Sequence, residues 1–162
     1  MPNFIAKPPI PVVLDTNIVM DMLHFGDPRT VALREAMAGQ RIQCFSDSSC
    51  LAELERVAAY AQFQLAENEQ RILLRTYRGL VTLCEADETA DLPALPRCRD
   101  ADDQKFLELA ARCGARVLVT RDKELLRLAR HRRMPAPFAI GNAEDAGRLL
   151  LELAPEHPAR LV

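Results

Sequence analysis

Two aspartates follow short apolar runs of the chain, and their placement suggests metal chemistry. Asp15 comes directly after the apolar residues 11–14. Asp122 comes three residues after the run 117–119. Both runs have the length and β-branched content of a buried strand. If these strands are neighbours, both carboxylates project into one cleft with no obvious lysine between them. Carboxylates that close repel each other, and a divalent cation relieves the repulsion.

Either acid has a simpler interpretation, as the N-cap of the helix predicted to follow it. Asn17 lies two residues after Asp15, and its amide is placed to donate a hydrogen bond to that carboxylate.

Two further helices each offer more than one acid. Asp103 begins an apolar helical stripe, with Asp100 and Asp102 as close competitors, and a first-turn acid also suits the helix dipole. Glu53 and Glu55 flank the apolar face of another predicted helix at similar angles on opposite sides. Helical periodicity does not choose between these two glutamates, and either one also fits a solvated flank.

The elements that must position these acids alternate along the chain. Strands are predicted near residues 11–15, 41–45, 80–84, 116–120 and 138–140. Helices are predicted at 16–24, 30–38, 48–60, 66–78, 103–113, 122–132 and 142–153. The pattern indicates an α/β fold, with a mainly parallel sheet of about five strands flanked by helices. Sites in such folds lie beyond the carboxyl ends of the strands, where Asp15 and Asp122 fall.

Length and composition set the broad class. The 162 residues suit one domain, assigned to residues 11–153, with an extended leader at 1–10 and a tail at 154–162. The net charge of -2 excludes a strongly cationic nucleic-acid coat, and no apolar run is long enough for a membrane helix. The five cysteines include no C-x-x-C pair, so we expect small buried thiols in a reducing cytoplasm rather than disulfides or a zinc knuckle.

Other chemistries fit the chain less well. No glycine-rich phosphate loop or G-x-S-x-G nucleophile motif is present, and the three histidines are isolated. A haloacid-dehalogenase-type phosphatase requires an aspartate where Asn17 stands. A receiver-type domain would need an acceptor aspartate after the third strand, which here ends in Cys84 and Glu85.

Four blocks of the chain together resemble a PIN domain, over about residues 11–150. In chain order they read VVLDTNI (12–18), LAELERV (51–57), RDADDQKFLELA (99–110) and LVTRDKELL (118–126). The last two blocks are particularly similar to the family branch of toxin components from bacterial toxin–antitoxin pairs. The irregular stretch 85–99 has no clear counterpart in the family pattern.

The resemblance implies an acidic quartet that binds Mg²⁺ or Mn²⁺. Carried across by motif, the quartet is Asp15, Glu53, Asp103 and Asp122. Asp100 also matches a recurrent acid of this branch and competes for the third place. Asn17 and Thr120 match polar residues that orient the ligating carboxylates.

The implied function is a metal-dependent endoribonuclease that hydrolyses RNA with a metal-activated water, as a toxin restrained by an antitoxin. The alternative is a PIN-like module that binds RNA or protein without cleavage. Related domains often form homodimers. Basic residues after Asp122 suit an RNA backbone or simply a solvated helix face. They are Lys123, Arg127, Arg130, Arg132 and Arg133.

Overall fold

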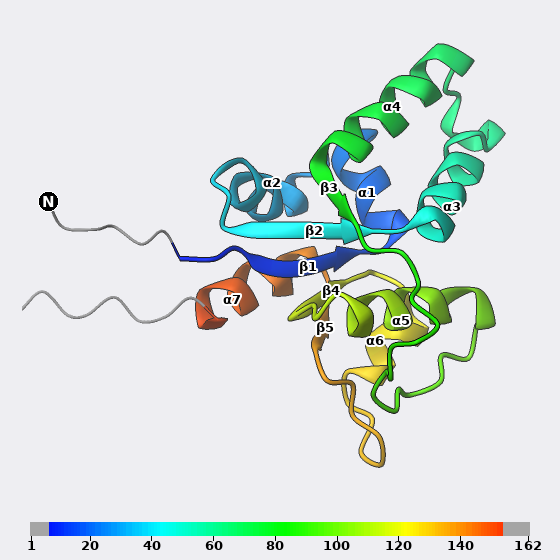
Figure 1. Ribbon diagram of the computed structural model, residues 1–162. Coiled ribbons are helices and arrows are strands. Elements are labelled where there is room, and N and C mark those ends of the chain that lie inside the picture. The colour runs from blue at the N-terminus through cyan, green and yellow to red at the C-terminus, as the bar shows by residue number, and fades with distance from the viewer. Residues whose placement is uncertain (1–6, 154–162) are drawn as a thin grey trace, which may run out of the picture.

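A parallel sheet forms the centre of the protein in a computed structural model, which describes residues 7–153. Its five strands lie in the order β3-β2-β1-β4-β5, and every neighbouring pair is parallel. Figure 1 shows β1 and β2 pointing the same way, with α3 following the tip of β2. The strands are β1 (Ile10–Leu14), β2 (Ile42–Ser46), β3 (Val81–Leu83), β4 (Val117–Val119) and β5 (Ala139–Gly141).

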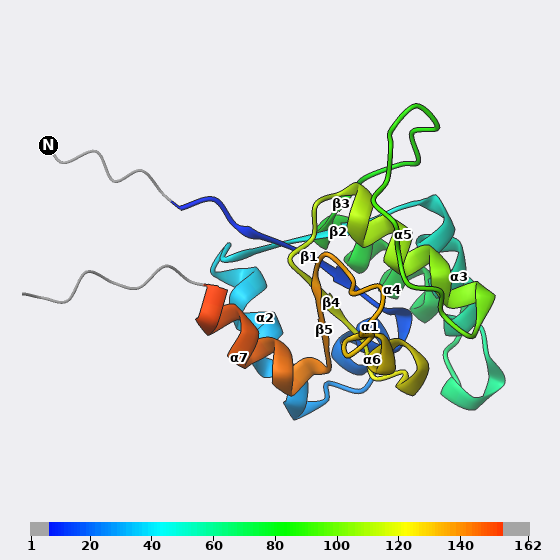
Figure 2. The same cartoon turned by 90° about the horizontal axis from the view of Figure 1, so that it is seen from below.

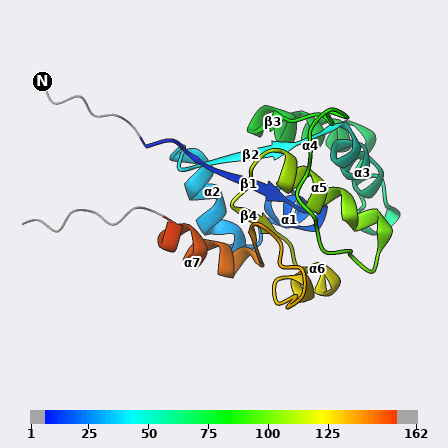
Figure 3. The ribbon, with the colours of Figure 1, turned by 60° about the horizontal axis from the view of Figure 1, so that its bottom comes forward.

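Helices connect successive strands, as the parallel order requires. Within the described residues they are α1 (Thr16–Leu23), α2 (Val31–Ala38), α3 (Ser48–Ala58), α4 (Glu67–Leu80), α5 (Gln104–Arg112), α6 (Lys123–Leu128) and α7 (Ala143–Leu153). Helices α2 and α7 pack against each other near the starts of the strands (Figure 2). Helices α3 and α5 lie side by side at the opposite end (Figure 3).

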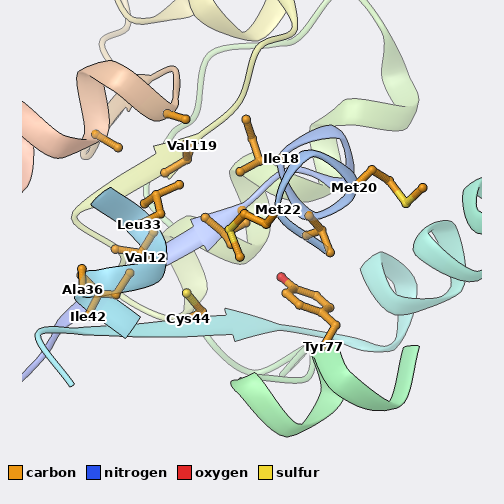
Figure 4. Close-up of a cluster of buried hydrophobic side chains, with 14 of the residues drawn as sticks. Val12, Ile18, Met20, Met22, Leu33, Ala36, Ile42, Cys44, Tyr77 and Val119 are labelled. Atoms are coloured by element: carbon orange, nitrogen blue, oxygen red, sulfur yellow. The ribbon is translucent and has the colours of Figure 1, made fainter. Parts of the chain in front are cut away.

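Alternation along the strands separates two apolar layers. Val12 and Leu14 of β1 face the layer that holds α1, α2, α4 and α7, whereas Val13 faces the layer that holds α5 and α6. Figure 4 shows the first layer, where Met22 of α1, Leu33 of α2 and Tyr77 of α4 converge. Both faces of the sheet are therefore covered, which explains why the central strands are continuously apolar.

The predicted elements are present, with corrections at three helix ends. Helix α4 continues through Gly79 to Leu80, although the glycine was expected to end it. Helix α3 ends at Ala58 rather than residue 60. Helix α6 ends at Leu128 rather than residue 132, because the next three backbone N–H groups bond to carbonyls only three residues back.

The remaining predictions concern the chain ends, the loop and the thiols. Strand β1 already includes Ile10, the last residue assigned to the leader, and the tail 154–162 lies outside the described residues. Residues 84–100 contain no helix or strand. All five cysteines are free thiols, and three of them are buried. None of the helices between residues 7 and 153 has the length and apolar content needed to cross a membrane.

Candidate active site

The carboxyl ends of β1 and β4 lie side by side. Val12 of β1 pairs with Val117 of β4, so the condition for Asp15 and Asp122 to share a cleft is met. The pairing extends to the site itself, because the Asp15 N–H donates to the Val119 carbonyl over 2.9 Å. The two chain segments that carry the acids therefore leave the sheet at one edge.

Asp15 is held inside this edge by two polar side chains. It is only 4% exposed, and its Oδ2 accepts bonds from Thr120 Oγ1 at 2.7 Å and from Asn17 Nδ2 at 3.2 Å. The Asn17 contact is the one that its spacing predicts. Asp15 occupies the N-cap position of α1 but makes no side-chain cap bond, so its carboxylate points elsewhere.

The pKa of Asp15 is raised from 3.8 to about 6, first by burial and then by the negative charges of Glu53 and Asp122, while the bond from Thr120 opposes the rise. The charged form of this carboxylate is therefore disfavoured in the folded protein without a cation.

Asp122 both caps the helix that follows it and shares a pocket with Asp15. Its Oδ1 accepts from the backbone N–H groups of Glu124 at 2.8 Å and Leu125 at 3.4 Å, so it does cap α6. Its own N–H donates to Thr120 Oγ1 over 3.0 Å. Thr120 is fully buried and thus bonds to both acids, which fixes their relative positions.

The two glutamates of α3 face different hollows. Glu53 lines the hollow that also contains Asp15 and Asp122, whereas Glu55 lines another, beside Arg78 and Leu83. Glu53 Oε1 lies 2.8 Å from Lys105 Nζ, and its Oε2 accepts a bond from the Thr16 hydroxyl. The tertiary structure therefore distinguishes two residues that helical periodicity left equivalent.

Asp103 is the third-block acid that reaches the same hollow. Burial raises its pKa from 3.8 to about 7, with further contributions from the charges of Asp15, Asp122, Asp100 and Glu53, in that order. Asp100 instead caps the short 3-10 turn Ala101–Asp103, accepting from the Asp102 N–H at 3.0 Å. Asp100 is therefore close enough to act on Asp103 electrostatically, but it does not line the hollow.

These acids share one open pocket of about 210 Å³, here called the acidic pocket. Its lining comprises Asp15, Glu53, Asp103 and Asp122 together with Thr16, Asn17, Met20, Val57, Phe63 and Arg121. The acidic pocket is thus lined by carboxylates, by polar side chains and by the apolar side chains of Met20, Val57 and Phe63.

The donor chemistry of the acidic pocket suits a hard divalent cation, since every candidate ligand is a carboxylate oxygen. In the side-chain arrangement seen within residues 7–153, however, no three carboxylate, imidazole or thiol groups converge closely enough to hold a metal ion. Glu53 is bound to Lys105 and Thr16, and Asp122 to the start of α6. The expectation of no lysine between Asp15 and Asp122 concerned those two acids alone; Lys105 instead pairs with Glu53.

The basic residues after Asp122 do not line the acidic pocket. Lys123 lines a neighbouring hollow, and Arg127 pairs with Glu124 at 3.2 Å on the exposed side of α6. Arg130 lies beyond the end of that helix, as do the later arginines. The arginine that does line the acidic pocket is Arg121, whose guanidinium also bonds both carboxylate oxygens of Asp21.

Three contributors were missed by sequence reasoning. Thr16 and Arg121 each stand next to a predicted acid, so inspection of the immediate neighbours would have found them. Lys105 is two residues from Asp103, but its pairing with Glu53 depends on the packing of α5 against α3. No pattern in the sequence reports that packing.

Comparison with known proteins gives one result that bears on this site. Residues 11–124, which contain all four acids of the acidic pocket, match the family model described as PIN domain. A comparison with curated proteins found no match.

Proposed function

The chain belongs to the PIN domain family, and we propose that it is a metal-dependent endoribonuclease whose active site is the acidic pocket. PIN domains are generally nucleases and typically use divalent metal ions. The observation that supports the finer assignment is the meeting of four acids from four separate segments in one pocket: Asp15, Glu53, Asp103 and Asp122. We assign these four as ligands of Mg²⁺ or Mn²⁺.

The proposed roles follow from the contacts of each residue. A divalent cation, when bound, supplies the positive charge that lowers the pKa of a water molecule and neutralises charge on a scissile phosphate. Asp15 suits this role, because Thr120 and Asn17 fix the orientation of its carboxylate and no Lys or Arg among residues 7–153 forms an ion pair with it. To serve as a ligand together with Asp15, Glu53 must give up its contact with Lys105. Arg121 is placed to contact a phosphate at the rim.

A metal-dependence assay tests this proposal. Single-stranded RNA should be cleaved in Mg²⁺ or Mn²⁺ and left intact in excess EDTA. Asp15→Asn should abolish cleavage, whereas Asp91→Asn, the same exchange at an exposed position outside the acidic pocket, should not. Cleavage that persists in EDTA and in the Asp15→Asn protein would contradict the proposal.

We further propose that the nuclease is the toxin of a toxin–antitoxin pair and acts in the cytoplasm; a homodimer is also proposed, because related domains often dimerise. The support is the resemblance of residues 99–110 and 118–126 to that branch of the family. Expression of the chain alone should arrest bacterial growth, and co-expression of the protein encoded by the neighbouring reading frame should restore it. Growth unaffected by the chain alone would exclude the toxin role without excluding the nuclease.

A module that binds without cleaving is the second candidate. It is favoured by the bonds that two of the acids already make, Glu53 to Lys105 and Asp122 to the start of α6. RNA binding without cleavage in any divalent metal would establish this alternative.

A further inference from the structure

An aromatic cluster lies on the surface beside the acidic pocket. It consists of His24, Phe25, Tyr60 and Phe63. Phe63 is at its centre, with its ring centroid 5.8 Å from Phe25, 6.4 Å from Tyr60 and 5.7 Å from His24. The rings come from the end of α1 and from the turn between α3 and α4.

The exposure of this aromatic cluster is unusual for the chain. Phe25 is 56% exposed and Tyr60 is 52% exposed, and among residues 7–153 no other phenylalanine or tyrosine is mainly exposed. Exposed rings that gather in one place mark interaction sites more often than scattered ones do. The turn that presents them is also specifically shaped, because Gln64 adopts a left-handed backbone with φ of 51°, which is uncommon outside glycine.

The aromatic cluster is continuous with the acidic pocket. Phe63 lines the pocket together with Met20, Val57 and the four carboxylates. A phosphodiester placed at the acids therefore has its neighbouring bases within reach of Phe63 and the rings around it. Every base has a flat π-face, and aromatic side chains bind single strands by stacking against these faces. Bases inside a duplex are already stacked on one another and would not be available.

We propose that the aromatic cluster is the surface on which bases next to the scissile phosphodiester stack. This inference rests on the proposed nuclease function. Arg121 lines the same pocket and is 53% exposed, so its guanidinium, which also bonds Asp21, is accessible to the strand's backbone. Stacking reads no particular base, so the expected selectivity is for single strands over duplexes rather than for sequence.

Binding is measured apart from cleavage, in Mg²⁺ and in a Glu53→Gln background that suppresses hydrolysis. The probes are a fluorescein-labelled 12-nucleotide RNA strand and its duplex, followed by anisotropy. Replacing Phe25 and Tyr60 together with leucine removes the π-faces but keeps apolar surface, and should weaken single-strand binding about tenfold or more. Leu83→Ala removes apolar surface at a position that is also 56% exposed but lies outside the acidic pocket, and should leave binding unchanged.

A second measurement needs no disruptive variant. The chain has no tryptophan and two tyrosines, of which Tyr77 is buried, so quenching by stacked RNA reports on Tyr60. RNA should quench tyrosine emission in the background protein. Tyr60→Phe should lose the quenching while keeping affinity, whereas Tyr60→Leu should lose affinity.

The outcomes separate this inference from the proposed function. Single-strand affinity that is unchanged in the double leucine variant, or lost equally in Leu83→Ala, overturns the stacking surface. If the double leucine variant changes its oligomeric state but keeps its RNA affinity, the aromatic cluster is a protein interface and the stacking proposal is overturned. A parent that does not bind single strands also overturns it. If the wild-type protein binds single strands through the aromatic cluster but does not cleave them, the stacking proposal stands and the proposed nuclease function is excluded.

Discussion

Lys105 places its Nζ 2.8 Å from Glu53 Oε1, one of the four carboxylates of the acidic pocket, although Lys105 itself does not line that pocket. Both side chains are largely buried, at 19% and 15% exposure, so water screens this ion pair weakly. The pair connects α5 to α3 and engages one of the candidate ligands. The lysine therefore occupies, in the metal-free protein, part of the electrostatic role proposed for a cation.

Removing this lysine should strengthen metal binding. Lys105→Met deletes the charge that competes for Glu53, so Mn²⁺ affinity measured by calorimetry should rise about tenfold or more. The metal-free variant should be less stable than the wild type, because the repulsion among the acids is no longer relieved. Lys123→Met is the matched control, since Lys123 lines a different hollow, and its Mn²⁺ affinity should stay near the wild-type value. Weaker Mn²⁺ binding in Lys105→Met would contradict the competition.

The two glutamates of α3 provide a second matched pair. Glu53→Gln should reduce metal affinity and cleavage at least about tenfold, because the amide loses the charge that neutralises a cation. Glu55→Gln should change either quantity little and stability by about 0.5 kcal/mol or less, since Glu55 faces another hollow. Cleavage rates, metal titration and circular dichroism on both variants check this. Equal effects would show that the second motif is misplaced.

The acids after β1 and β4 could be predicted because their placement is local. Each follows an apolar run, and the alternation of strands and helices was enough to put both at one edge of a parallel sheet. Asn17 could be predicted for the same reason, since its contact with Asp15 spans only two residues. The placement of these residues at the carboxyl edge needed no knowledge of how distant elements pack, whereas the shared cleft depended on β1 and β4 being neighbours, which the sequence left open.

The choice between Glu53 and Glu55, and between Asp103 and its neighbours, could not be made by periodicity. Both choices depend on which side of a helix meets a different helix, namely α3 against α5. The family pattern selected Glu53 and Asp103, and both line the acidic pocket. The ion pair between Lys105 and Glu53 arises from the same packing and had no local signal.

Thr120 should prove important for both acids that it contacts. Thr120→Val keeps the shape of a fully buried side chain but removes the hydroxyl that donates to Asp15 and accepts from the Asp122 N–H. We expect a loss of about 1–3 kcal/mol in the free energy of unfolding, measured with urea. Thr82→Val is the control on an exposed strand position, where little change is expected. A neutral effect at Thr120 would show that its bonds do not stabilise the site.

The last prediction concerns the pH dependence of stability without metal. Burial gives Asp15 a folded-state pKa of about 6 and Asp103 one of about 7, both above the ordinary value of 3.8. The folded protein therefore binds protons that the unfolded chain has already released. Stability in EDTA should fall as the pH rises from about 4 to about 7, and Asp15 alone should account for about 2–3 kcal/mol.

Two controls separate this effect from other titrations. Asp15→Asn removes one of the two groups responsible, so urea unfolding of this variant should depend less steeply on pH. Saturating Mn²⁺ should also remove the fall, because a bound cation favours the charged carboxylates. Stability that rises through the interval in EDTA, or a slope that Asp15→Asn leaves unchanged, would mean that the acidic pocket is not short of positive charge.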